Sequence, residues 1–573
     1  MVTDSGARPA RQPGRYRARL GALLLACTAL AAFGAGPGGW FDPESGRPVM
    51  KNFRPTDYSG HPQVFSIAFG ADGYVCFGNQ EGMLEFDGAR WQHYPAPTPH
   101  VYRLDRDKAG RLWAAGNDEL GYYEPQPGGG WRYVSLVPLL PPEFKPLGRT
   151  LSVLTRDDAV YFTGSRGLLR WKDGKMRNWP DKVSRWATVQ EVDGQVFVHG
   201  GQFGLWRFVG DELQPVSTAP ELKFEWPLVP LAVQDGRLRC ALGFSGVFSV
   251  DLKSGAVTRE PGPLDALVAQ TRITDGLKLH DGTFALGTSG RGLVLVSADL
   301  ARLRVLDRST GLADNVILSL GEDREGGLWL GFNSGAARLD LSSPVSVFDA
   351  SNGPTPGTTD IWGRHRGRVY AGTFDGVYLL EPADPVKATG ARFVRINGEL
   401  GNVFGLLSVD GELIVANNLG LSRLNDDRSA TLLVDTRPNS PYWVTRSAKR
   451  PERYYVGGQR GLSVVERTPA GWRKLGERLD LGDVHNLVED ADGSVWLSTY
   501  SRGFWRVPTA DRIEDWSQAT YEHYRENCGL PEGFVWTTVT AGLHGPVFFT
   551  DKGAVRFDAA AKRFRPEDRY LVD

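Results

Sequence analysis

Short runs of alternating apolar and polar residues recur along most of the chain, separated by polar turns rich in Gly and Asp. The segment 317–340, ILSLGEDREGGLWLGFNSGAARLD, shows the arrangement: an apolar run, a turn, a second run, a Gly-containing loop and a third run. Alternation over about four to eight residues predicts β-strands. Because no interval carries a sustained helical period of apolar residues, we predict an all-β protein.

The arrangement returns at a regular spacing, for example as FSIAFGADGYVCFGNQEGMLEFDG near the start and as LVEDADGSVWLSTYSRGFWRV at 487–507. The residue that closes the second run marks each copy, and the markers are Gly78, Ala115, Gly164, Gly200, Gly243, Gly287, Gly331, Gly372, Ala416, Gly457, Ser498 and Thr550. Their spacing runs from 36 residues (Gly164 to Gly200) to 52 residues (Ser498 to Thr550). Such a period, with a fourth strand after the third, is typical of a propeller blade. The fold class that we predict is therefore all-β, with tandem β-propellers of four-stranded blades.

Four residues of the segment 317–340 have a physical role in such a blade. Asp323 can accept hydrogen bonds from nearby backbone amides, and Gly326 can take the positive φ of a tight hairpin. Trp329 and Gly331 face the same side of one strand, where the ring can fill the wedge between blades and the glycine allows close approach. The same positions recur as Asp107, Gly110 and Trp113, and as Asp490, Gly493 and Trp496.

The motif DREGGLWLGFNSGAARLD, preceded by GLADNVI, resembles the two-component regulator propeller repeat. The stretch FRPTDYSGHPQVFSIAFGADGYVCFGNQEGMLEFDGARW is similar to the start of sensor proteins that carry a triple-tyrosine module. The resemblance covers roughly residues 50–570. It implies a periplasmic sensor region of tandem seven-bladed propellers, followed in that family by a β-sandwich, a membrane helix and a signalling module.

The marker count suggests how the chain divides. Seven markers, Gly78 to Gly331, predict a first propeller of about seven blades at 40–350, and five more predict a second propeller region of about five recognisable blades at 351–573. Two interpretations stay open. We favour a truncated, incomplete second ring that lacks two blades and the output machinery; the alternative is two six-bladed rings that make the chain complete.

The N-terminus has the pattern of a secretory signal peptide. Five Arg residues between 8 and 19 precede an apolar run at 20–33 and the stretch GAGPGG. We expect residues 1–39 to be the signal peptide, cleaved between Gly34 and Gly39, because the apolar run is short for a retained anchor. The predicted location is the periplasm of a Gram-negative cell, with no membrane span in the mature chain.

Composition narrows the function. The formal net charge is -1, so we expect no nucleic acid partner. Cys76, Cys240 and Cys528 are widely separated, and no CxxC, HExxH or HxH spacing occurs, so we expect no metal and no cofactor. No carboxylates stand in a recognisable catalytic motif, so we expect no enzymatic activity, in this chain neither a kinase nor a hydrolase.

Propellers bind ligands on the loops at one end of the ring, so the resemblance implies that candidate binding residues lie there. Our candidates are Asn79, Glu81, Asn117, Glu119, Arg149, Arg166, Trp186, Gln202, Trp226, Arg272 and Asn333, with His100 and Tyr102 at the start of innermost strands. Aromatic faces, amides and Arg side chains suit a sugar or an acidic oligosaccharide. The same residues could instead stabilise turns or pair with carboxylates.

The expected function is therefore a ligand-sensing propeller, the input region of a two-component-type protein, that binds an unknown small molecule or glycan. The alternative is a scaffold that binds another envelope protein, and a less favoured one is a secreted polysaccharide-active enzyme.

Overall fold

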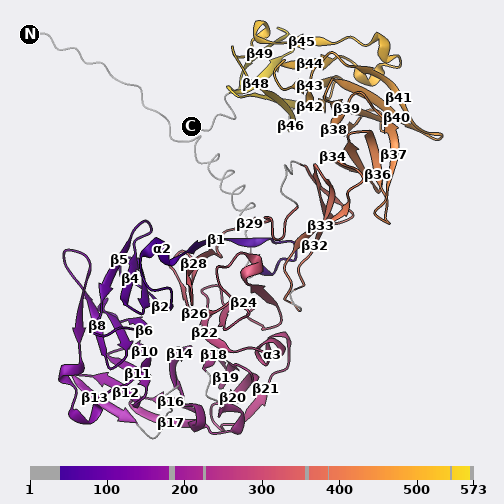
Figure 1. Cartoon of the computed structure of the whole chain (residues 1–573). Coiled ribbons are helices and arrows are strands. Elements are labelled where there is room, and N and C mark those ends of the chain that lie inside the picture. Colours follow the sequence, from indigo (N-terminus) through magenta and orange to yellow (C-terminus); the bar gives the residue numbers. More distant parts are fainter. Residues whose placement is uncertain are drawn as a thin grey trace, which may run out of the picture. The chain divides into compact units, whose positions relative to one another are not determined.

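The computed structural model of the protein describes residues 39–179, 187–223, 227–354, 361–384, 386, 388–542 and 545–567. These residues form two compact units. The first contains the described residues up to Val347 together with those of Pro382–Ala391, and the second contains the remaining described residues from Phe348 onward. Each unit is built almost wholly of short antiparallel strands (Figure 1).

The strands of the first unit are β1 Arg47–Phe53, β2 Val64–Phe69, β3 Val75–Asn79, β4 Gly82–Phe86, β5 Trp91–Pro95, β6 Val101–Arg106, β7 Leu112–Gly116, β8 Leu120–Pro125, β9 Trp131–Ser135, β10 Thr150–Arg156, β11 Ala159–Gly164, β12 Gly167–Lys172, β13 Lys175–Trp179, β14 Thr188–Val192, β15 Gln195–His199, β16 Leu205–Val209, β17 Glu212–Ser217, β18 Leu228–Gln234, β19 Arg237–Leu242, β20 Gly246–Asp251, β21 Val257–Arg259, β22 Ile273–Lys278, β23 Phe284–Thr288, β24 Leu293–Val296, β25 Leu303–Leu306, β26 Ile317–Glu322, β27 Gly327–Phe332, β28 Gly335–Asp340 and β29 Ser346–Val347. Its helices are η1 Gly39–Phe41, α2 Pro55–Tyr58, η2 Val137–Leu139, η3 Pro142–Phe144, η4 Gly201–Phe203, η5 Pro220–Leu222, α3 Pro263–Val268 and η6 Arg308–Thr310.

The strands of the second unit are β30 Ile361–His365, β31 Arg368–Thr373, β32 Gly376–Glu381, β33 Arg392–Asn397, β34 Val403–Val409, β35 Glu412–Asn417, β36 Gly420–Leu424, β37 Ala430–Asp435, β38 Pro441–Arg446, β39 Arg453–Gly458, β40 Leu462–Thr468, β41 Gly471–Arg478, β42 Val484–Glu489, β43 Val495–Thr499, β44 Phe504–Val507, β45 Glu522–Tyr524, β46 Thr537–Gly542, β47 Gly545–Thr550, β48 Gly553–Asp558 and β49 Arg563–Pro566. Its helices are η7 Ala510–Arg512, η8 Trp516–Gln518 and η9 Glu526–Cys528.

The described strands of the first unit form a β-propeller. They make seven antiparallel sheets, six of which contain four consecutive strands in sequence order, from β2–β5 to β22–β25. The first strand of each sheet packs against the first strand of the next, and β26 packs against both β22 and β2. These innermost strands therefore surround the centre of the unit (Figure 1), and the predicted propeller fold is confirmed.

The N-terminal strand completes the last sheet of this ring. The strand order in that sheet is β26-β27-β28-β1-β29, and β1 pairs with β28 from Phe53 opposite Ala336 to Val49 opposite Asp340. The buried Arg304 side chain donates hydrogen bonds to the carbonyl oxygens of Trp40 (2.8 Å) and Gly46, just before β1. Burial lowers the pKa of Arg304 to about 10. Residues far apart in sequence thus close the ring.

The blade motif has the roles that its residues predict. The Trp329 ring lies between the last and first sheets, 5.6 Å from the Phe77 ring. Asp323 Oδ1 accepts a hydrogen bond from Gly327 N (2.7 Å), and its Oδ2 accepts bonds from Trp329 Nε1 (2.9 Å) and Arg338 Nε (2.8 Å). In another blade Asp107 Oδ2 likewise accepts a bond from the indole of Trp113. One carboxylate therefore fixes both the turn and the wedge aromatic.

The described strands of the second unit form five sheets, β30–β33, β34–β37, β38–β41, β42–β45 and β46–β49. Their first strands pack against one another in that order. The segment 508–530, which lengthens one repeat, contains η7, η8, η9 and the fourth strand β45, with Trp516 buried in the core.

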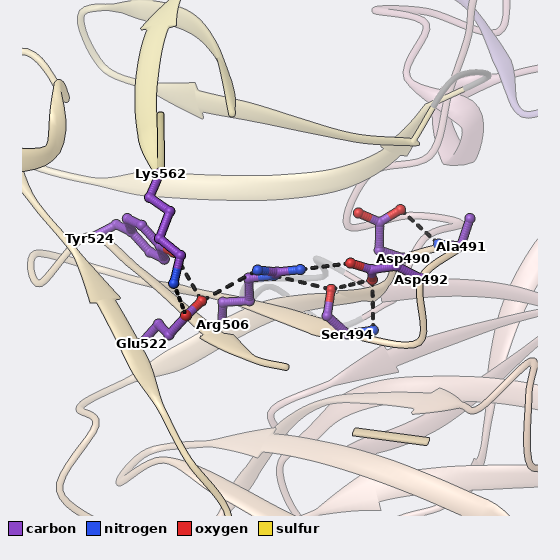
Figure 2. A network of polar contacts seen from close by, with 8 residues as sticks. All are labelled: Asp490, Ala491, Asp492, Ser494, Arg506, Glu522, Tyr524 and Lys562. Atoms are coloured by element: carbon purple, nitrogen blue, oxygen red, sulfur yellow. Dashed lines mark hydrogen bonds and ion pairs between the residues drawn. The ribbon is translucent and has the colours of Figure 1, made fainter. Parts of the chain in front are cut away.

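In the blade β42–β45, Asp492 and not Asp490 binds the Arg beside the wedge Trp. Figure 2 shows Arg506 of β44 between Asp492 and Glu522: Arg506 Nη2 donates to Asp492 Oδ2 (2.6 Å), and Nη1 donates to Glu522 Oε2 (3.3 Å). Lys562 of the next blade donates to Glu522 Oε1 (3.1 Å). The Arg506 guanidinium also lies over the Trp496 ring, 5.4 Å from its centroid. Charge pairs thus join two neighbouring blades around the wedge Trp.

We expect Gly331→Ala to destabilise the protein, because a Cβ at this position would lie 2.6 Å from Val64 O in the first sheet. Overpacking of this kind costs about 1–3 kcal/mol. Calorimetry should show a lower Tm for this variant, whereas Gly128→Ala should leave the Tm unchanged because a Cβ at Gly128 meets no atom within 4 Å. Equal Tm values for both variants would contradict the close approach of the sheets.

We expect Asp323→Asn to lower the free energy of unfolding by about 1–3 kcal/mol at neutral pH, because the Asn keeps the shape but not the charge that binds Arg338. Burial would raise the pKa of Asp323, but hydrogen bonds from Arg338, Gly327 and Trp329 outweigh it and hold the pKa below its ordinary value.

A lowered folded-state pKa stabilises the protein above the unfolded pKa of about 4, and that stabilisation is lost as the pH falls. The difference between wild type and Asp323→Asn should therefore shrink below about pH 4, as measured by urea unfolding. The exposed Asp426→Asn serves as the control. A difference that grows in acid would disprove this account.

Candidate functional site

A β-bulge recurs at the start of the innermost strands in the first unit. In β2, β6, β10, β22 and β26 the pairing register shifts between the first and third residues. The second residue in each strand is therefore unpaired, and these residues are Phe65, Tyr102, Leu151, Thr274 and Leu318. Bulges re-aim side chains, and all five of these line one cavity.

The cavity lies in the channel at the centre of the ring. Its volume is about 960 Å³, and residues of all seven innermost strands contribute to its wall. Phe65 and Tyr102 meet edge to face at 5.2 Å, and His100 stacks on Tyr102 at 5.4 Å. One end of the channel is therefore aromatic.

Strand pairing identifies that end. The first residue of an innermost strand lies opposite the last residue of its neighbour, as in Val101 opposite Gly116 and Ile273 opposite Thr288. The loop that joins the second and third strands follows immediately. The bulged side chains therefore lie at the loop end of the channel, where the sequence predicts ligand binding.

Charged side chains gather toward the other end. Asp105, Glu191, Asp193 and Lys278 line the cavity wall near or beyond the ends of β6, β14 and β22. Lys278 Nζ lies 2.9 Å from Asp193 Oδ1, and Arg156 forms an ion pair with Glu191. These pairs compensate much of the acidic charge.

Asp105 joins two blades. Its Oδ2 accepts hydrogen bonds from Thr155 N (2.6 Å) and Thr155 Oγ1 (3.0 Å) of β10. Burial raises the pKa of Asp105 to about 6, although the hydrogen bonds from Thr155 and from Arg106 N oppose this shift. The channel wall thus contains a carboxylate whose pKa lies above its ordinary value.

Three of the residues proposed from the sequence have well-defined surroundings. Arg272 lies in the cavity wall immediately before β22, and burial lowers its pKa. Asn79 is buried and donates hydrogen bonds to His61 O (2.7 Å) and Gln63 O (2.8 Å). Glu119 is buried and accepts bonds from Ser135 and Tyr133; burial raises its pKa against those bonds. The contacts of Asn79 and Glu119 stabilise loops.

Six other candidates lie outside the cavity wall: Gln202 in the short helix η4, and Glu81, Asn117, Arg149, Arg166 and Asn333 on loops. Arg166 Nε donates to Pro146 O (2.7 Å), and Asn333 Oδ1 accepts a bond from Gln63 Nε2 (2.6 Å). Trp186 and Trp226 fall outside the described residues. Of the described candidates, Arg272 and the strand-start residue Tyr102 lie in the channel wall.

The sequence did not single out Arg103, Asp275 or Phe65, which line the cavity. Arg103 and Asp275 each follow a bulged residue, and the alternation of apolar and polar residues in the sequence does not reveal a bulge. Their position at the third residue of an innermost strand is the signal that could have identified them.

The second unit repeats the bulge at Phe404, Tyr442 and His485. Phe404 and Tyr442 meet edge to face at 5.2 Å, and Tyr442 stacks on His485 at 4.9 Å with 7° between the rings. Phe374 and Tyr500, both exposed, extend this row at its two ends. Equivalent positions in three neighbouring blades thus form a continuous aromatic row.

Two features bear on metal binding and on membrane insertion. In the part of the chain that the structure describes, no group of three or more His, Cys, Asp or Glu side chains is placed to hold a metal ion. No helix among the described residues has the length and apolar character needed to cross a bilayer.

Comparison with known proteins identifies the repeat. Residues 311–334 match the family described as two component regulator propeller, which confirms the resemblance seen in the sequence. These residues include all of β26 and β27, with Asp323 and Trp329. A search of curated proteins finds no match.

Three solved structures are similar to this chain, one of them with a TM-score above 0.5. The extracellular domain of a protein described as a hybrid two component system of B. thetaiotaomicron is 14% identical, with a TM-score of 0.60 over 91% of this chain and 78% of that chain. A second such domain from the same organism is 13% identical, with a TM-score of 0.40 over 90% and 73%. Virginiamycin B lyase from Staphylococcus aureus is 13% identical, with a TM-score of 0.39 over 51% and 99%. At this level of identity, the first of these matches shows the fold alone.

We expect Asp105→Asn to change how stability depends on pH. A carboxyl whose folded-state pKa is raised stabilises the protein below the unfolded pKa of about 4, and this stabilisation is lost as the pH rises through about 6. The Tm of the variant minus that of wild type should therefore increase from about pH 4 to pH 7. Calorimetry with the exposed Glu143→Gln as control checks this; a difference that decreases over the same range would refute it.

Proposed function

Because the chain carries a repeat of the two component regulator propeller family, we propose that it is a ligand-sensing domain of a two-component-type protein. A structural relative with a TM-score of 0.60 is an extracellular domain, and the Arg-rich, apolar N-terminal sequence has the pattern of an export signal. Both support a protein that acts outside the cytoplasm, in the periplasm. In this role the chain binds a ligand and catalyses no reaction.

The observation that carries the proposal is the cavity at the centre of the first unit. Its volume of about 960 Å³ suits a small molecule or a short oligosaccharide. Phe65 and Tyr102 supply apolar faces, and Arg272 supplies hydrogen-bond donors at the same end. Bulges in five strands direct side chains into this space. The cavity lining therefore combines aromatic and polar side chains.

The ligand class that this lining supports is a sugar or an acidic oligosaccharide. Aromatic rings contact the apolar face of a pyranose, while Arg donors contact hydroxyl or carboxylate oxygens. The second unit offers a separate aromatic row, Phe404, Tyr442 and His485. Burial raises the pKa of Tyr442 and lowers that of His485, so both rings are neutral at pH 7.

A second candidate function is a scaffold that binds another envelope protein. It is favoured by the exposed apolar side chains at the loop ends of the second unit, which are Phe374, Leu419, Trp443, Tyr500, Val535 and Trp536. Exposed apolar groups that gather on one side are typical of protein interfaces. Stable association with an envelope protein, with no response to glycans, would favour this function.

We expect Tyr102→Ala to weaken ligand binding by at least about tenfold, because the ring is a wall of the cavity. The measurement is calorimetric titration of the full chain with a panel of neutral and acidic oligosaccharides, after a thermal-shift screen. Tyr74→Ala is the matched control, since Tyr74 is exposed and does not line the cavity. If no compound in the panel shifts the Tm of wild type, the channel is not a glycan site.

A further inference from the structure

An ion pair in the first unit joins two blades that are not neighbours. Arg103 is the third residue of β6 and Asp275 the third residue of β22, so the two lie at the same depth in the channel. Arg103 Nη1 is 3.2 Å from Asp275 Oδ2. Both residues line the cavity, next to the bulged residues Tyr102 and Thr274. The pair therefore lies below the aromatic end of the channel.

Asp275 is held firmly. Its side chain is 11% exposed, and Oδ2 also accepts a hydrogen bond from Leu320 N of β26 (3.0 Å). The carboxylate thus bridges three blades, because β6, β22 and β26 belong to three sheets. Such a fixed acceptor orients the guanidinium that it binds.

Arg103 keeps donors that no described residue of the protein accepts. Its side chain is 28% exposed, although it lies in the cavity wall. It contacts Asp275 through Nη1, and no described residue accepts a hydrogen bond from its Nε or Nη2. These two nitrogens form the edge of a guanidinium that matches the two oxygens of a carboxylate or sulfate.

Basic and acidic side chains are unevenly distributed along the channel. The innermost strands all begin at the loop end, where Arg272 precedes β22. Arg103 follows at the third position, whereas Asp105, Glu191 and Asp193 lie farther along. Of these acids, Glu191 and Asp193 are paired with Arg156 and Lys278. An anionic group that enters from the loop end therefore meets Arg272 and the Arg103–Asp275 pair before it meets Asp105, Glu191 and Asp193.

We propose that Arg103, oriented by Asp275, binds a carboxylate or sulfate group of the ligand, so that the channel selects acidic over neutral ligands. This inference rests on the proposed function of the channel as a ligand site. The aromatic residues Phe65 and Tyr102 then contact the apolar part of the same ligand.

The experiment is calorimetric titration of the full chain with three matched probes: trigalacturonate, a sulfated disaccharide and neutral maltotriose. Wild type should bind at least one acidic probe more tightly than maltotriose, and this binding should weaken as salt is raised. Arg103→Gln should lower the affinity for the acidic probe about ten- to hundredfold, as expected for charge-assisted hydrogen bonds, and should leave maltotriose binding unchanged.

Two further variants distinguish the effects of the charge and the guanidinium geometry of Arg103 from an effect on folding. Arg103→Lys keeps the charge and the contact with Asp275 but loses the planar fork, so its affinity for the acidic probe should lie between those of wild type and Arg103→Gln. Arg106→Gln is the control, because Arg106 is exposed on the same strand and does not line the cavity. Thermal unfolding verifies that each variant is folded.

The outcomes distinguish this inference from the function on which it rests. If maltotriose binds as tightly as the acidic probes, or if Arg103→Gln binds the acidic probes like wild type, the role of Arg103 is refuted while the channel remains a ligand site. If no probe binds wild type, both the inference and the glycan-sensing function are overturned.

Discussion

The pairing of β1 with β28 is the interaction on which the first unit depends. A propeller encloses a channel only when its first and last sheets meet, and here the strand at 47–53 supplies that closure by pairing with the strand at 335–340. Arg304 binds the carbonyl oxygens just before β1, and Trp329 fills the wedge between the joined sheets. The cavity wall, which takes residues from all seven innermost strands, exists because this pairing forms.

Within the closed ring, a local irregularity decides which side chains face the centre. Regular alternation would send successive residues of an innermost strand toward its two neighbouring blades. The bulge interrupts that alternation and turns the second residue, such as Phe65 or Tyr102, into the channel. The same bulge places Phe404 and Tyr442 in the aromatic row of the second unit. One backbone device therefore builds the candidate site in both units.

Charge pairs and hydrogen bonds to carboxylates fix the positions of Trp and Arg side chains in the blades and in the channel. Fixed carboxylates, such as Asp323 at the blade turns and Asp275 in the channel, accept several hydrogen bonds each and so hold Trp and Arg side chains in defined positions. Around Arg506 the pairing is different, but the result is the same: charge pairs secure the wedge Trp496. Fully paired charges of this kind stabilise the blades, and the donors left over on Arg103 are what a ligand can use.

The sequence by itself determined the blade. Its repeat spacing, its Asp and Gly turns and its Trp–x–Gly pattern predict four-stranded sheets and wedge packing, because these features depend on residues close in sequence. It also placed Arg272 near the channel, yet it did not separate that residue from Asn79 or Glu119, which make hydrogen bonds within their own loops. Only the tertiary structure decided which side chains share the cavity. The reason is physical: bulges, ring closure and the Arg103–Asp275 pair join strands that are up to about 290 residues apart, and no local pattern of apolar and polar residues records those contacts.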